Sequence, residues 1–445
     1  MTKRFLFHVR LLRSAIFFFI CFFASKVGIS QLPATAQEPE TFIITILNES
    51  ASPISGRAVY ISPVDWPFLE HDHGFPLLKD QKKNKIPCQI INQEDSRRNK
   101  SLFFVVDMEK NEARHYTLSW TEQPTVYDQQ VRIRLNKREG KNEVLTSVSE
   151  EVFLPMMLPK LTGFQAYQTD GPSFENEKVA FRHYLDGRNS KDVFGKKVKG
   201  LLPDSVGVSR TGEVMDNYHV MADWGRDILP VGTSLGLGGL GILHNGKISR
   251  LGVTQKDSVH TIKETRFKIL NNGPLYGSFS IEYDEWKPGQ DRHYHLKEEP
   301  AIWAGPYAYE NTVKFKDLTG DEQLLIGLPK VATEKIPVQM KVNNWMVLYT
   351  YDKQTYNKEF NLGLALLVPW DLFDGWEKAP ADGEVNSTYL VKLKVNNIYP
   401  VTYYAVAGWE LSDPAFKTEK GFSAYLRAMT ATLDAKLNIS IRKGE

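Results

Sequence analysis

Cysteine is nearly absent from this chain of 445 residues, which contains two, Cys21 and Cys88. Cys21 lies in an apolar run near the amino terminus, in a segment that we expect to be removed on export. Cys88 would then remain alone, so the mature chain would contain no internal disulfide. A large exported protein without one must be held together by its own core.

Long hydrophobic runs are also scarce, and the one that stands out is SAIFFFICFFAS at residues 14–25. This run follows a basic stretch, is short for a bilayer span and precedes PATAQ, a pattern typical of a secretory signal. We therefore predict a signal peptide over residues 1–36, and an exported protein, periplasmic or secreted, with no stable membrane insertion. The alternative is an uncleaved anchor, because the run approaches the minimum length of a span.

Neither sign of charge is in excess. Loss of residues 1–36 would remove five Lys or Arg and no acid, which leaves 50 basic and 53 acidic side chains and a net charge of about −3. Such a balance gives no general attraction to nucleic acid, which is not an expected partner. An anionic ligand would have to be bound by a local cluster of bases. Composition does not indicate an oligomeric state.

The chain has no repeat of fixed period and no low-complexity segment, which disfavours solenoids and propellers. Helical periodicity is convincing only over residues 417–438, where Phe422, Leu426, Met429 and Leu433 recur at steps of three and four. Short β-branched and aromatic runs between turn residues fill most of the rest. The sequence therefore predicts a mainly all-β protein with one C-terminal helix.

Two β domains are expected from the spacing of these runs. Residues 37–122 hold short candidate strands separated by polar turns, which is typical of a small β-sandwich. Residues 123–445 hold more and longer runs, including ETRFKILNNGPLYGSFSIEYDEW at 264–286, in which two strands flank an N-N-G-P turn. This larger region predicts a broad sheet and carries the candidate site.

A possible metal motif lies in HDH at residues 71–73. Two imidazoles two positions apart on a strand share a face, with Asp72 between them in the sequence. A third and a fourth ligand are not visible nearby, so the sequence favours a polar loop, and we predict no metal.

A second motif, in VGTSLGLGGLG at residues 231–241, has the G-x-G-x-x-G pattern through Gly236, Gly238 and Gly241. That pattern binds a dinucleotide when a βαβ unit surrounds it, and none does so here. We expect these glycines to let the backbone turn sharply or approach a ligand closely, and we predict no cofactor.

Ionisable residues are dense in AFRHYLDGRNSKDVFGKK, residues 180–197. Aromatic and aliphatic side chains interleave with them in a way that a solvated surface rarely shows. If FRHYLDG is a strand, Arg182 and Tyr184 share a face with Asp186, and His183 points to the other face. The segment is predicted to form a functional site.

Two motif blocks carry a family resemblance: DGPSFENEKVAFRHYLDGRNSKDVFGKK at 170–197 and YHVMADWGRDILPVGTSLGLGGLG at 218–241. Together they resemble a family of exported bacterial proteins that carry a domain of unknown function, and the likeness covers most of the mature chain. Members occur among enzymes that dismantle acidic plant and algal polysaccharides, and the ulvan oligosaccharide dehydratase looks like a member. The resemblance implies a galactose-mutarotase-like supersandwich, and loss of water from a non-reducing-end uronic acid to give a 4,5-unsaturated sugar.

An acidic oligosaccharide would need bases for its carboxylate. A guanidinium meets a carboxylate with two parallel hydrogen bonds, so arginine is the residue of choice. The candidate substrate-binding residues in the two motif blocks are Arg182, Arg188, Arg226, Lys178, Asn189 and Trp224.

Elimination also needs a base for the C5 proton and an acid for the departing 4-hydroxyl. We assign His219 as the base and Tyr184 as the acid; the reverse assignment stays open, because neighbouring cations can lower the pKa of a phenol. Tyr218 and Lys178 are the alternates. Each of these side chains could also be an ordinary hydrogen-bonded residue near the core.

Acidic residues of the motif blocks keep other functions open: Glu175, Asp186, Asp223 and Asp227. Two carboxyl groups at a suitable separation would make a glycoside hydrolase of uronate-containing oligosaccharides. The same acids could instead orient the arginines and the histidine through hydrogen bonds. A non-catalytic sugar-binding protein is the third class, since aromatic rings and one arginine would suffice.

Overall fold

The computed structural model describes residues 40–62, 66, 74–92, 100–140, 143–155, 165–254, 259–289 and 291–444. Strands predominate, and α1 (Glu419–Asp434) is the one α-helix among the described residues. The predicted fold class, mainly β with a C-terminal helix, is confirmed. Within the described part of the chain, no helix is both long and apolar enough to traverse a membrane.

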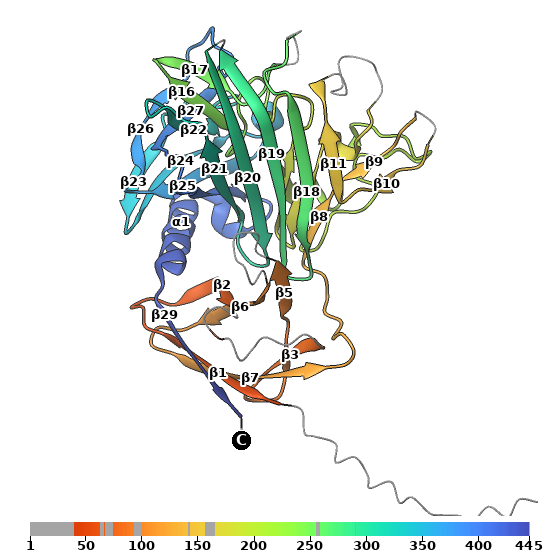
Figure 1. Cartoon of the computed structure of the whole chain (residues 1–445), viewed down its shortest axis with the longest axis vertical. Helices are drawn as coiled ribbons and strands as arrows, with labels where there is room; N and C mark the ends of the chain where they lie inside the picture. Colours follow the sequence, from red (N-terminus) through yellow and green to blue (C-terminus); the bar gives the residue numbers. More distant parts are fainter. Residues whose placement is uncertain are drawn as a thin grey trace, which may run out of the picture. The chain divides into compact units, whose positions relative to one another are not determined.

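The second-largest buried core of the described residues lies between two antiparallel sheets (Figure 1). One has the order β29 (Leu437–Lys443), β1 (Phe42–Asn48), β7 (Ala113–Thr121), β3 (Phe75–Asp80) and β4 (Lys85–Ile86). The other has the order β2 (Ile54–Ile61), β6 (Lys100–Met108) and β5 (Gln89–Asn92). Ile44 and Ile46 of β1 share this core with Phe104 and Val106 of β6. The predicted small β-sandwich is thus confirmed.

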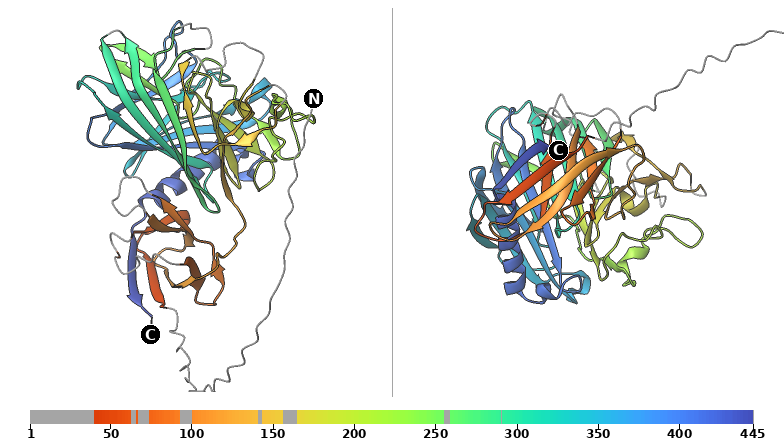
Figure 2. Two further views of the ribbon diagram at one scale, coloured as in Figure 1. Left: turned by 45° about the vertical axis from the view of Figure 1, so that its right-hand side comes forward. Right: turned by 90° about the horizontal axis from the view of Figure 1, so that it is seen from below.

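Strand β29 comes from the far end of the chain. It pairs with β1 in antiparallel register, from Phe42 opposite Lys443 to Asn48 opposite Leu437, and Figure 2 shows the blue C-terminal strand beside the red first strand. The sequence pattern groups β29 with the larger region, residues 123–445, yet this strand completes a sheet of the small β-sandwich. Alternation of apolar residues fixes which face of a strand is buried, not which strand becomes its neighbour. The boundary at residue 122 stays a prediction.

A nine-stranded antiparallel sheet forms one layer of the larger core. Its order is β11 (Glu150–Phe153), β18 (Glu264–Asn272), β19 (Tyr276–Gly289), β20 (Arg292–Trp303), β21 (Ala308–Lys316), β28 (Val401–Trp409), β25 (Asn361–Pro369), β24 (Trp345–Lys353) and β23 (Val338–Val342). Strands β18 to β21 run side by side in Figure 1. The predicted N-N-G-P turn joins β18 to β19.

Two five-stranded sheets face this layer. The site sheet has the order β15 (Gly225–Asp227), β14 (Lys191–Lys196), β13 (Val179–His183), β12 (Ser173–Asn176) and β8 (Val131–Arg134). The second has the order β17 (Lys247–Arg250), β16 (Leu240–His244), β22 (Gln323–Pro329), β27 (Thr388–Lys394) and β26 (Phe373–Lys378). A short ladder of β9 (Asn136–Lys137) and β10 (Thr146–Ser147) stands apart.

Side chains of both five-stranded sheets enter the same core as the nine-stranded sheet. Phe174 of the site sheet meets Phe279 and Tyr309 of the nine-stranded sheet edge to face, with ring centroids 5.2 and 5.1 Å apart. Ile242 and Leu324 of the second sheet join this core. Broad sheets stacked in two layers are the supersandwich arrangement that the family resemblance implies.

Helix α1 packs on the nine-stranded sheet through the predicted residues. Phe422 and Leu426 are fully buried, and Met429 is buried beside them. The ring of Phe422 sits over Gly363 and Gly408, which pair across β25 and β28. A Cβ atom at Gly363 would lie 2.4 Å from that ring, so the absence of two side chains makes room for the helix.

Candidate active site

The centre of the site is built on three neighbouring strands of the site sheet. Antiparallel pairing sets Arg182 of β13 opposite Asp192 of β14, and Phe194 of β14 opposite Asp227 of β15. The predicted strand ends at His183, and D-G-R-N forms the turn that leads into β14. The three strands together bring one base, Arg182, and two acids, Asp192 and Asp227, close to one another.

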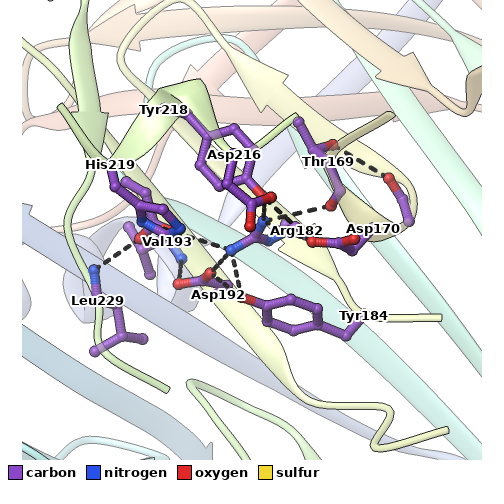
Figure 3. A network of polar contacts seen from close by, with 12 residues as sticks. Thr169, Asp170, Arg182, Tyr184, Asp192, Val193, Asp216, Tyr218, His219 and Leu229 are labelled. Atoms are coloured by element: carbon purple, nitrogen blue, oxygen red, sulfur yellow. Dashed lines mark hydrogen bonds and ion pairs between the residues drawn. The ribbon is translucent and has the colours of Figure 1, made fainter. Parts of the chain in front are cut away.

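Arg182 lies at the middle of this group and has no exposed surface. Figure 3 shows its guanidinium among the surrounding acids and phenols. It donates to carboxylates of Asp192 and Asp227, the latter at 2.9 Å, and to the hydroxyls of Tyr184 and Tyr218. We call these five residues the Arg182 cluster.

Burial gives the Arg182 cluster its electrostatics. The pKa of Asp227 is raised well above its usual range, first by burial and then by the charge of Asp192, and Arg182 only partly offsets this. The pKa of Arg182 is itself raised, because the acidic and phenolic groups around it outweigh its desolvation. One guanidinium therefore donates hydrogen bonds to two buried carboxyl groups, and the protonated form of Asp227 is favoured.

Two short 3₁₀ turns place further groups at the Arg182 cluster. Turn η3 (Gln168–Asp170) supplies Asp170, whose Oδ2 lies 3.9 Å from the Arg182 guanidinium and 3.1 Å from the Tyr218 hydroxyl. Turn η4 (Asn217–His219) supplies Tyr218 and His219, and the Tyr218 hydroxyl also donates to Asp216 at 2.9 Å. These contacts fix the phenol of Tyr218 in the interior.

His219 is the exposed member of the site. Its side chain is 40% exposed, and its Nδ1 lies 3.5 Å from Oδ2 of Asp227. Partial burial and the positive charge of Arg182 lower the pKa of His219 below its ordinary value. The imidazole is therefore neutral at pH 7 and can accept a proton, as the predicted base requires.

Arg188 and Asp186 stand beside the Arg182 cluster as a pair. The Arg188 guanidinium lies 2.7 Å from Asp186, and its Cζ lies 4.4 Å from the centre of the Tyr184 ring. The Arg188 side chain is 13% exposed, so it is the most accessible of the three predicted arginines. Predicted to bind substrate, Arg182 instead lies beneath the site, where a carboxylate would not reach it.

Glu175 of β12 and Lys178, which lies between β12 and β13, are placed away from the Arg182 cluster. Glu175 is buried between Lys196, at 2.6 Å, and Arg132, at 2.8 Å. Lys178 lies over the ring of Tyr307, with its Nζ 5.2 Å from the ring centre. Glu175 therefore neutralises buried bases of the sheet, and Lys178 packs on an aromatic surface.

Three other predicted residues do not touch the Arg182 guanidinium either. Asn189 contacts His183 at 3.3 Å on the other face of β13, where His183 was expected to point. Trp224 packs against the edge of Phe194, with ring centroids 6.3 Å apart. Asp223 is exposed.

Arg226 holds a different segment. It donates to Glu359 at 2.6 Å and lies over the ring of Phe360, 5.8 Å from its centre. Both partners follow the turn η5 (Tyr356–Lys358), which joins β24 to β25. Arg226 thereby fastens the turn that carries Tyr356, whose ring lies 5.4 Å from that of His219.

Sequence reasoning missed four residues of the site. Asp192 could have been found, because a hairpin centred on D-G-R-N places it opposite Arg182. Asp170 opens the first motif block and Asp216 lies two residues before the second, but neither has a recognisable pattern. Tyr356 had no signal at all, since it lies in an unremarkable turn far along the chain.

The glycine motif lets the backbone pass close to other groups of the protein. Gly236 has a φ of 75°, and a Cβ there would lie 1.9 Å from the carbonyl oxygen of Lys191. Gly238 has a φ of 79°, and its backbone accepts a hydrogen bond from Tyr403. Such contacts leave no space for a side chain at either position.

The H-x-H motif at residues 71–73 lies outside the described residues. In the ranges that the structure describes, no three His, Cys, Asp or Glu side chains gather as a metal site would require.

A two-layer all-β fold with an exposed histidine over a buried arginine–aspartate cluster thus defines this protein. It belongs to the family described as Domain of unknown function (DUF4861), whose family model matches residues 48–439. A relative, "Uncharacterized protein P7" of Formosa agariphila, is 24% identical over 325 residues, which are 69% of this chain and 76% of that protein.

Two solved structures from Enterococcus faecalis show a weak likeness in fold. One is a protein in the glycosyl hydrolase family 38, with 10% identity, a TM-score of 0.48, and coverage of 91% of this chain and 47% of that one. The other is an alpha-mannosidase, with 11% identity, a TM-score of 0.46, and coverage of 91% and 46%. The chain spans about half the length of these structures, and a likeness at this level assigns it no activity.

Proposed function

We propose that this protein is an exported carbohydrate-active enzyme that eliminates water from the non-reducing-end uronic acid of acidic, ulvan-type oligosaccharides. The product would be a 4,5-unsaturated uronate. One observation carries the proposal: the neutral, 40% exposed His219 lies 3.5 Å from a carboxyl group of the buried Arg182 cluster. The resemblance of the two motif blocks to a family with a dehydratase member supports this reaction class.

The proposed reaction starts at C5 of the uronic acid. Nε2 of His219 takes the C5 proton, the released electron pair forms the C4–C5 double bond, and the C4–oxygen bond breaks. His219 suits this step because an imidazole must be unprotonated to act as a base, and its lowered pKa favours that form. The imidazolium that forms would lie 3.5 Å from the carboxyl group of Asp227, whose oxygen can accept a hydrogen bond from Nδ1 of His219.

The carboxylate of the substrate must be neutralised before C5 becomes acidic enough. Arg188 is the candidate, because it is the most exposed of the predicted arginines and lies against Tyr184 at the edge of the cluster. It would exchange part of its pairing with Asp186 for the substrate. Arg182 would add positive potential from below without touching the sugar.

A hydrolase fits this geometry less well. Glycoside hydrolysis needs two carboxyl groups on either side of the scissile bond, separated by about 5–10 Å. Asp192 and Asp227 instead bind the same nitrogen of Arg182, and both are completely buried. A purely binding protein would have no need for a neutral imidazole placed against a buried acid.

The test is incubation with saturated, uronate-terminated oligosaccharides, followed by mass spectrometry and near-ultraviolet absorbance. We expect loss of one water per molecule and a new absorbance from the conjugated carboxylate. His219→Gln should lower kcat by at least about a hundredfold with little change in binding, whereas the exposed His293→Gln should match the wild type. Cleaved sugars without water loss, or full activity of His219→Gln, would contradict the proposal.

A further inference from the structure

Tyr356 is the one tyrosine of the site whose hydroxyl is uncommitted. It is partly exposed, and its ring meets that of His219 at 5.4 Å and 71°. Within the described ranges, its hydroxyl has no hydrogen-bond partner. The hydroxyls of Tyr184 and Tyr218, in contrast, are bound to buried acids, at 2.9 Å to Asp192 and at 3.1 Å to Asp170.

The turn that carries Tyr356 is firmly held. Thr355 is fully buried; its Oγ1 accepts from the Phe360 amide at 3.1 Å and its carbonyl oxygen accepts from the Lys358 amide at 2.9 Å. Arg226 of the site sheet fastens the far end of the turn through Glu359. The position of Tyr356 is therefore set by the fold, as a group that must meet a reacting atom requires.

Charges of the Arg182 cluster act on Tyr356. Burial raises the pKa of its hydroxyl well above the ordinary value, and the charges of Asp227 and Asp192 raise it further, with Arg182 and Arg188 opposing. The phenol thus lies within electrostatic reach of the cluster and stays protonated. A protonated, accessible hydroxyl can donate a proton but cannot serve as the resting base.

We propose that Tyr356, rather than Tyr184, donates the proton to the departing 4-hydroxyl group; this inference rests on the proposed function. Tyr356 and His219 would then act on the same sugar, His219 on the C5 proton and Tyr356 on the C4 oxygen. Water leaves with the proton of Tyr356, and a phenolate and an imidazolium remain. Transfer of one proton from His219 to Tyr356, directly or through a water, restores both groups. Tyr184 and Arg226 are positioning residues in this scheme.

The test compares two leaving groups. Fluoride leaves carbon without protonation, so a 4-fluoro substrate should not need the donor. With the natural 4-hydroxyl substrate, Tyr356→Phe should lose about a hundredfold to ten-thousandfold in kcat. With the 4-fluoro substrate, Tyr356→Phe should stay within about tenfold of the wild type, whereas His219→Gln should remain slow on both substrates because the C5 proton still needs a base.

Controls separate the role from folding and from the proposed function. Tyr356→Phe removes an unbonded hydroxyl and should keep the wild-type melting temperature, and Tyr399→Phe, at a 70% exposed site, should match the wild type throughout. An inactive wild type overturns the proposed function and this inference with it. An active wild type with a fully active Tyr356→Phe, or with one that fluoride does not rescue, overturns the role of Tyr356 alone.

Discussion

Replacement of Arg182 by methionine probes the centre of the site. The change removes the one cation that contacts Asp192 and Asp227, while both carboxyl groups keep their full burial. Loss of one partner from a buried ion pair costs about 3–5 kcal/mol, because a charge is left without compensation. Hydrogen bonds to Tyr184 and Tyr218 disappear as well, so we expect the upper part of that range.

Urea unfolding, followed by tryptophan fluorescence, measures this loss for Arg182→Met. In the variant, the pKa of Asp227, which burial and the charge of Asp192 already raise, should rise further because Arg182 no longer opposes them, so the folded state binds this proton more tightly than the unfolded chain. The stability that the proton contributes is present at low pH and is lost as pH rises through the raised pKa, so the loss of stability relative to the wild type should grow as pH rises above the usual range of an aspartate.

Arg114→Met is the matched control for this experiment. Arg114 also contacts a carboxylate, Glu112 at 2.7 Å, but its side chain is 41% exposed. An exposed pair of this kind contributes about 0–1 kcal/mol, so the control should lose little. If Arg182→Met lost as little free energy of unfolding as Arg114→Met, the view that Arg182 stabilises two buried carboxyl groups would be refuted.

Two further predictions concern the fold. Burial and the charge of Lys191 lower the pKa of His183 to about 4, so its protonation favours the unfolded chain, and about 2 kcal/mol should be lost between pH 7 and pH 5; urea midpoints should show this increment in the wild type and not in His183→Gln. Gly363→Ala should lower stability by about 1–3 kcal/mol through a clash with Phe422, whereas Gly383→Ala, whose nearest contact would be at 3.4 Å, should change the melting temperature little.

Local periodicity predicted much of the fold. The spacing of Phe422, Leu426 and Met429 gave the helix and its buried face, and N-N-G-P gave the turn between β18 and β19. Long-range pairing was beyond such patterns. The predicted helical pattern extended to residue 438, but α1 ends at Asp434 and Leu437 begins β29, whose partner β1 lies at the other end of the chain.

The site was predictable where neighbouring strands carry it. Alternation set Arg182 and Tyr184 on one face and His183 on the other, and the structure agrees. Density of charge alone could not tell a substrate-facing arginine from a buried one, so Arg182 was expected to bind substrate. Tyr356 contacts His219 only because the turn between β24 and β25 lies beside the turn that precedes β15. No local sequence pattern indicates such a contact.

The most direct measurement of the central claim uses a substrate with deuterium at C5 of its terminal uronic acid. If His219 removes that proton in an elimination, the product lacks the label as well as one water, and the wild type shows a slower rate with the labelled substrate when proton removal limits turnover. A product that keeps its C5 deuterium would contradict the account.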